Sequence, residues 1–106
     1  MNRGELPTSL RIDPAELRRL CRKWQIEELA LFGSVLRPDF DDSSDIDLLL
    51  TFADAAPWNL LDLVRLRSEL RSLLGRPVDL VEKRSLRNPY RRREIERDAR
   101  VVYSAA

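Results

Sequence analysis

Residues 45–52 constrain the fold most strongly, because their pattern suits a β-strand and little else. Apolar side chains stand at every second position from Ile46 to Phe52, whereas aspartates stand at positions 45 and 47. Successive side chains of a strand point to opposite faces of its sheet. The segment is therefore predicted to be a strand that buries one face and carries Asp45 and Asp47 together on the other.

The rest of the chain alternates helix and strand signals around this strand. Helices are predicted over residues 13–24, 58–74 and 88–99, from capping or proline signals and apolar stripes at helical spacing, with Gly75 as a stop. Strands are predicted over 29–32 and 77–81, with 101–103 as an edge strand, and one helical turn over 34–37. The prediction is a single α/β (α+β) domain over 1–106, with a loose leader at 1–11. It has a small mixed sheet with helices packed mainly on one face.

Composition narrows the compartment and the metal chemistry. No apolar run approaches the roughly 20 residues that span a membrane, and the amino terminus carries no secretory signal, so we expect a cytoplasmic protein without a membrane partner. The chain has no histidine and one cysteine, Cys21, which we expect to be a small buried hydrophobe. Any metal site must then use carboxylates, which favours Mg²⁺, Mn²⁺ or Ca²⁺ over Zn²⁺.

Five residues form the candidate site. Gly33 and Ser34 stand between a predicted strand and a helical turn, where a glycine lets a phosphate approach and a helix start offers free N–H groups. Asp45 and Asp47 follow after ten intervening residues, and Asp79 adds a carboxylate from a separate strand. Carboxylates so crowded can hold one or two hard cations, and a pair of cations about 4 Å apart can bridge a triphosphate. The pattern predicts phosphoryl-group chemistry.

Simpler interpretations exist for these and other residues. Gly33 could merely end a strand, Ser34 cap a helix, and the two aspartates form the solvated face of an edge strand. Trp58 and Leu61 lie off the helix stripe, which fits either end-of-helix packing or an exposed patch for a partner. Residues 91–93 are arginines that suit a solvated helix face, with pairs such as Arg92 and Glu96, or an acidic partner protein. Nucleic-acid binding is disfavoured because the net charge is only +1 and aromatics are not interleaved.

The spacing of these motifs resembles a known signature. Gly33-Ser34, ten residues, and then Asp45-Ile46-Asp47 resembles the DNA polymerase beta-like nucleotidyltransferase superfamily. Residues 31–34 and 44–48 are similar to the minimal nucleotidyltransferase family of bacteria and archaea, and the likeness extends from about residue 17 to 103.

The resemblance implies roles for the site residues. Asp45 and Asp47 would bind Mg²⁺, as one or two ions, and Asp79 would be a third ligand or the base for the acceptor hydroxyl. Gly33 and Ser34 would bind the triphosphate of ATP. The family commonly continues with a small residue, arginine and glycine, whereas this chain has Leu36-Arg37-Pro38. Arg37 matches and would contact phosphate or the partner, and Pro38 stiffens the loop.

The family also implies a biological role. Its members are often encoded beside HEPN-domain RNase toxins and act as their antitoxins, and some transfer AMP from ATP to a tyrosine of the toxin. We therefore expect a Mg²⁺-dependent protein adenylyltransferase that meets a HEPN-domain toxin and forms a homo- or hetero-oligomer. One alternative is a binding module that neutralises its partner by contact alone. Another is nucleotide transfer to a small molecule, for which a chain of this length would need a dimer.

Overall fold

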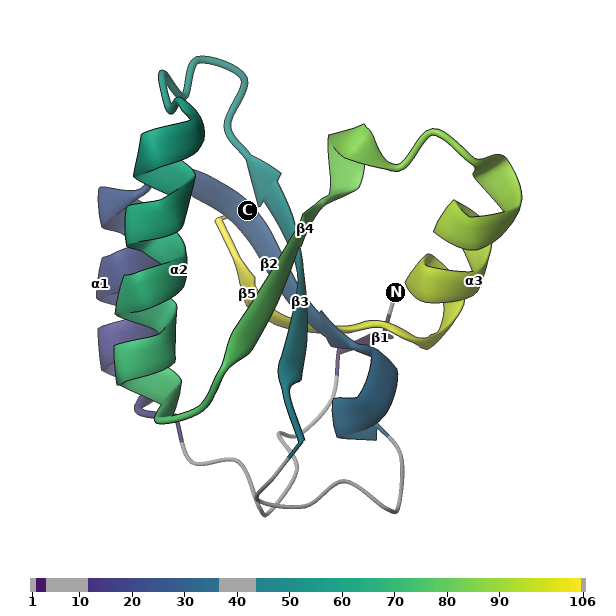
Figure 1. Ribbon diagram of the computed structural model, residues 1–106, viewed down its shortest axis with the longest axis horizontal. Coiled ribbons are helices and arrows are strands. Elements are labelled where there is room, and N and C mark those ends of the chain that lie inside the picture. Colours follow the sequence, from purple (N-terminus) through teal and green to yellow (C-terminus); the bar gives the residue numbers. More distant parts are fainter. Residues whose placement is uncertain (1, 4–11, 37–43, 106) are drawn as a thin grey trace.

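A computed structural model describes residues 2–3, 12–36 and 44–105, apart from the side chains of Asn2, Arg3, Ser34 and Val35. In it, the mixed sheet has five strands (Figure 1). The strands are β1 (Asn2–Arg3), β2 (Ile26–Phe32), β3 (Ile46–Phe52), β4 (Val78–Glu82) and β5 (Arg100–Ser104). The helices are α1 (Pro14–Lys23), α2 (Leu60–Leu74) and α3 (Pro89–Asp98), with short 3₁₀ helices η1 (Gly33–Leu36) and η2 (Lys83–Ser85).

The order of the strands brings distant parts of the chain together. The sheet runs β1-β5-β2-β3-β4. The β2–β3 and β2–β5 pairs are antiparallel, whereas β3–β4 and β1–β5 are parallel. The predicted mixed sheet and α/β class are thus confirmed.

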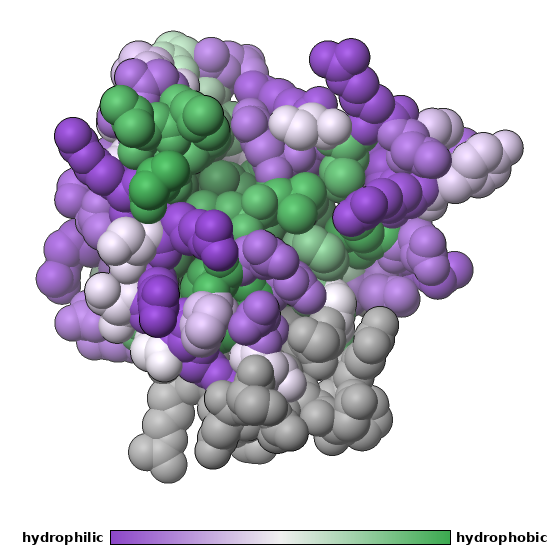
Figure 2. Space-filling view, viewed as in Figure 1, coloured by the Kyte–Doolittle hydropathy of each residue, from purple (hydrophilic) through white to green (hydrophobic). Residues whose placement is uncertain are grey.

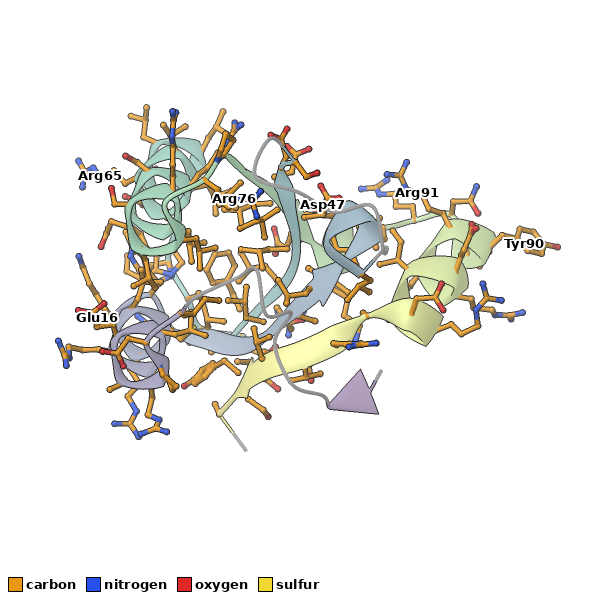
Figure 3. All side chains as sticks on the ribbon, turned by 90° about the horizontal axis from the view of Figure 1, so that it is seen from below. Glu16, Asp47, Arg65, Arg76, Tyr90 and Arg91 are labelled. Atoms are coloured by element: carbon orange, nitrogen blue, oxygen red, sulfur yellow. The ribbon has the colours of Figure 1, made fainter. Side chains whose placement is uncertain are left out.

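The two faces of the sheet are covered differently. Figure 1 and the perpendicular view in Figure 3 show α1 and α2 side by side on one face, with α3 toward the other. The main core lies under α1 and α2. It contains the predicted apolar positions of β3, which are at most 6% exposed: Ile46, Leu48, Leu50 and Phe52. Two helices on one face match the prediction.

Cys21 of α1 belongs to this main core and is fully buried, as expected for a small hydrophobe. Burial raises the pKa of its thiol to about 12. The thiol therefore stays protonated at neutral pH, because burial penalises the thiolate.

A second, smaller cluster lies on the opposite face. Leu49 of β3 packs there with Ala30 and Ala99, and Ile95 of α3 covers the group. Asp47 precedes Leu49 by two residues and therefore shares this face. The acidic face of β3 is thus partly apolar and partly covered by α3.

Local capping residues set the helix ends close to the predicted positions. Asp13 accepts a hydrogen bond from the Ala15 amide at 2.9 Å, and Asn59 and Asp62 form a reciprocal capping box at the start of α2. Gly75 ends α2 in the left-handed conformation, and Asn88 caps α3. No helix in the described part of the chain is long and apolar enough to cross a membrane.

Two sequence predictions were wrong at one side of the sheet. Asn2 and Arg3 were assigned to a loose leader, but they pair in parallel with Arg100 and Val101. As a result β5, predicted as an edge strand, lies between β1 and β2. Two residues carry no periodicity to detect, and this pairing joins segments almost a whole chain apart. The rest of the predicted leader lies outside the described residues.

Candidate active site

The site forms at one end of the sheet, where β2 ends and β3 and β4 begin. Because β2 is antiparallel to β3 and β3 is parallel to β4, these three termini meet at the same edge. Phe32 is the register partner of Asp47, and Asp47 is the register partner of Asp79. The fold therefore brings Gly33, Asp47 and Asp79 side by side. Figure 3 views this end of the molecule and labels Asp47 near η1.

Position 33 requires a glycine because of its backbone conformation and because of the nearby side chain of Asp47. Its φ is +72°, in the left-handed region that non-glycine residues rarely adopt. A Cβ atom at this position would collide with Asp47 Oδ2. The Asp47 carboxylate thus lies against the backbone of Gly33, in the space where a side chain would otherwise be. The sequence analysis predicted that a phosphate approaches the backbone of Gly33 closely. In the structure, the carboxylate of Asp47 approaches it closely.

The two strand-borne carboxylates form an adjacent pair. Asp47 and Asp79 sit in register on neighbouring parallel strands, which lie about 4.8 Å apart. Asp47 is partly buried and Asp79 is exposed. Asp45 is exposed and precedes β3 at the same end. Even so, the described residues contain no group of three or more His, Cys, Asp or Glu side chains already arranged around a metal position.

This donor set fits Mg²⁺ better than a metal that needs a complete protein cage. Mg²⁺ is usually held by one or two carboxylates, with substrate phosphates and water completing an octahedron. The Asp47–Asp79 pair meets that requirement with oxygen atoms alone, and Asp45 lies two residues from Asp47. The arrangement suits a cation that arrives together with a triphosphate.

Part of the predicted triphosphate site lies outside the described residues. The backbone of Ser34 belongs to η1, so a helical turn does follow Gly33, although it is 3₁₀ and covers 33–36. The Ser34 side chain, Arg37 and Pro38 are not among the described features. Triphosphate binding by Gly33, Ser34 and Arg37 therefore stays a prediction.

Two arginines near the site were missed by sequence reasoning. Arg67 Nε donates a 2.8 Å hydrogen bond to the carbonyl of Val78, the peptide that leads into Asp79. This bond holds the start of β4 against α2, and no local pattern announces a contact across 11 residues. Arg76 is partly buried three residues before Asp79, and Figure 3 labels it at the same end of the sheet as Asp47. Its position just before Asp79 was the available signal.

Ion pairs attach α3 beside the carboxylate face. Lys83 Nζ lies 3.3 Å from Glu96 of α3 and 4.0 Å from Glu28 of β2. Arg92 pairs with Glu96 at 3.2 Å, which confirms the predicted i,i+4 contact. Burial alone would raise the pKa of Glu96, but hydrogen bonds and attraction from Arg92 and Lys83 together outweigh it and lower that pKa. Ion pairs thus join α3 to the segment after β4, in addition to the packing of Ile95.

Comparison with known proteins gives similarities along most of the chain. The family described as "Nucleotidyltransferase domain" matches residues 16–102. A candidate protein adenylyltransferase of Methanocaldococcus jannaschii is 40% identical over 79 residues, which cover 74% of this chain and 79% of the relative. The protein adenylyltransferase MntA of Thermococcus cleftensis is 35% identical over 74 residues, covering 70% and 73% of the two chains.

Solved structures agree with this fold. A candidate minimal nucleotidyltransferase is 35% identical, with a TM-score of 0.63 over 84% of this chain and 95% of that one. An MNT antitoxin, solved in complex with the tri-AMPylated HEPN toxin of Shewanella oneidensis, is 22% identical. Its TM-score is 0.61 over 86% of this chain and 69% of that one, so the two share a fold.

Proposed function

Because this chain belongs to the nucleotidyltransferase domain family, we propose that it transfers AMP from ATP to a protein hydroxyl. The acceptor we propose is a tyrosine of a HEPN-domain toxin, which makes the chain an antitoxin. One observation carries the proposal: the register pairs Asp47 with Asp79 directly beside the close contact between Asp47 and Gly33. Two adjacent carboxylates next to an open backbone turn suit the transfer of a phosphoryl-type group.

The proposed reaction assigns a task to each residue. The acceptor oxygen forms a bond to the α-phosphorus of ATP. The bond from that phosphorus to the oxygen bridging the α- and β-phosphates breaks, and pyrophosphate leaves with the electron pair. Asp79, at the exposed edge of the pair, would take the proton of the hydroxyl. Gly33 and Ser34, with Arg37, would hold the triphosphate. Asp45 and Asp47, with or without Asp79, would hold one or two Mg²⁺ ions, which neutralise charge on the triphosphate and on departing pyrophosphate.

The identity of the acceptor rests on relatives. Two archaeal relatives at 35–40% identity are named as protein adenylyltransferases, one of them as a candidate. A structure with the same fold holds an AMPylated HEPN toxin and its MNT antitoxin. These names support a protein acceptor and a HEPN-domain partner. A carboxylate at the exposed edge of a sheet is also accessible to a hydroxyl on the surface of a folded partner protein.

The test mixes the chain with ATP, Mg²⁺ and a HEPN-domain protein, and measures the intact mass of that partner. We expect the partner to gain whole AMP units. Asp47→Asn keeps the shape of the side chain but removes its charge. Changing a residue that only hydrogen-bonds to a metal ligand typically lowers activity by about 10–100-fold, so the rate of transfer should fall by more than that. Wild-type protein that binds ATP and the partner yet leaves the partner's mass unchanged would contradict the proposal.

A second candidate is an antitoxin that acts by contact alone. Leu61 is 73% exposed on α2, so the chain offers apolar surface that a partner could cover. The double variant Asp45→Ala, Asp47→Ala separates the two functions. If it folds and still neutralises the toxin, contact suffices; if it folds and fails, transfer is needed.

A further inference from the structure

Apolar surface is concentrated on the first half of α2. Leu60, Leu61 and Val64 are 77%, 73% and 59% exposed. In the part of the chain that the structure describes, the remaining large hydrophobic side chain so exposed is Tyr90 of α3. Figure 2 shows a hydrophobic area over this part of α2 that continues toward β4. Adjacent exposed apolar residues on a helix commonly mark a site of interaction with another molecule.

A groove joins this apolar surface to the candidate site. It has a volume of about 260 Å³ and lies between α2 and β4. Leu60 and Val64 form its α2 rim, Leu50 and Leu80 contribute apolar surface, and Asp79 lines it from β4. One of the proposed catalytic carboxylates therefore belongs to the groove.

We propose that this groove, here called the α2–β4 groove, binds the acceptor protein through an apolar segment next to the residue that is modified. The proposal rests on the proposed function, because it assumes a protein hydroxyl that must reach Asp79. A macromolecular acceptor that presents its hydroxyl at Asp79 has to cover the surface beside it. The α2–β4 groove is the adjoining surface that is both apolar and concave.

Strand geometry sets the spacing of the bound segment. The groove follows β4 from Asp79 to Glu82, a span of roughly 10 Å at about 3.3 Å per residue. An extended segment would therefore place its apolar side chain about three residues from the acceptor hydroxyl. Among described residues β4 pairs with β3 alone, so the other edge of β4 could also hydrogen-bond an extended chain.

Charge and area favour a partner protein over the other occupants. Asp79 and Glu82 line the groove together with Arg67, so two carboxylates face one cation, and this balance disfavours the phosphates of a nucleic acid. A second copy of this chain is disfavoured by size. Three exposed side chains provide a few hundred Å², against the roughly 800 Å² per partner of a stable interface. Such a patch suits a contact that forms and dissociates with each turnover.

The test removes the apolar rim and leaves the carboxylates in place. In the variant Leu60→Ser, Val64→Ser both changes are on exposed positions, so circular dichroism and ATP binding should match wild type. We expect the Kd for the HEPN-domain protein to rise at least about tenfold, and the KM for that protein in the transfer assay to rise with it. Tyr90→Ser is the matched control, because it removes an equally exposed apolar side chain from α3, and it should change both values less than about twofold.

Each arm of the experiment decides a separate question. An unchanged Kd for the groove variant, or a loss of affinity in Tyr90→Ser instead, would overturn the proposal that the α2–β4 groove binds the acceptor protein. Sedimentation in which wild-type protein self-associates and the groove variant does not would assign the surface to a second copy and overturn it too. A groove variant that loses affinity while even the wild type transfers no AMP would leave the groove in place and reject the proposed function.

Discussion

Gly33 and Gly75 have the same backbone conformation in different surroundings. Their φ angles are +72° and +71°. A Cβ on Gly33 would collide with the carboxylate of Asp47, whereas a Cβ on Gly75 would meet no atom within 4 Å. The two positions therefore separate the cost of a left-handed backbone from the cost of displacing a candidate catalytic group.

Substitution of each glycine by alanine should show this difference. Gly33→Ala and Gly75→Ala should each lower the free energy of unfolding by about 1–2 kcal/mol, because alanine is strained at positive φ. Only Gly33→Ala should also impair ATP binding and transfer, because it moves Asp47. Urea unfolding and calorimetric ATP titration of both variants would measure the two effects. Equal losses of ATP affinity would argue against a role for the Gly33–Asp47 contact.

At the scale of elements, α3 differs from the two other helices in what holds it. It contains no buried residue, and Ile95 is the partly buried side chain that packs on the small cluster. Lys83 and Arg92 meet at Glu96, and Lys83 also reaches β2. The attachment of α3 should therefore depend more on pH than that of α1 and α2, which pack on the main core.

The pKa of Glu96 is lowered from 4.5 in the folded protein, so its ionised form stabilises the fold. That contribution should be present above pH 4.5 and should be lost as the pH falls through the lower, folded pKa. Glu96→Gln should thus be less stable than wild type near pH 7, by no more than the ~1 kcal/mol of a surface ion pair. The difference should vanish in acid. Urea unfolding from pH 3 to 7 tests this, and a difference independent of pH would contradict it.

For the whole molecule, the main core under α1 and α2 unites the elements, and two tryptophans report on it. Trp58 Nε1 donates to the Trp24 carbonyl at 2.6 Å, and the two rings meet edge-on with centroids 4.8 Å apart. Of the two interpretations of Trp58, packing at the helix end is the one observed, while Leu61 is the exposed residue. Tryptophan fluorescence should therefore follow global unfolding.

The core should control stability without controlling chemistry. Leu66 is fully buried, so Leu66→Ala should lower the free energy of unfolding by about 2–5 kcal/mol. Leu61→Ala, on the same helix but exposed, should change it by less than about 0.5 kcal/mol. Both variants, while folded, should bind ATP like wild type. Fluorescence-detected urea unfolding gives the comparison, and similar losses for both would contradict the assigned core.

Predictions that depended on short-range physics were confirmed. The side-chain alternation of Ile46–Phe52 identified the core face of β3, since a strand repeats every two residues. Asp13, Asn88 and Gly75 marked helix ends within one or two residues, since capping acts over a single turn. The same local signals identified Gly33 and the three aspartates, although their proposed roles stay predictions.

Other features depended on which segments meet. The place of β5 inside the sheet, the register of Asp47 with Asp79, and the bond from Arg67 to Val78 each join parts of the chain that are far apart in sequence. Alternation within one segment shows which of its faces is buried, but strand order depends on which segments pair, and a single segment does not show its partner. The amino-acid sequence thus determined the strands and the carboxylates. The adjacency of the carboxylates and the groove beside Asp79 depended on the tertiary structure, because they require the pairing of the strands and the packing of α2 on the sheet.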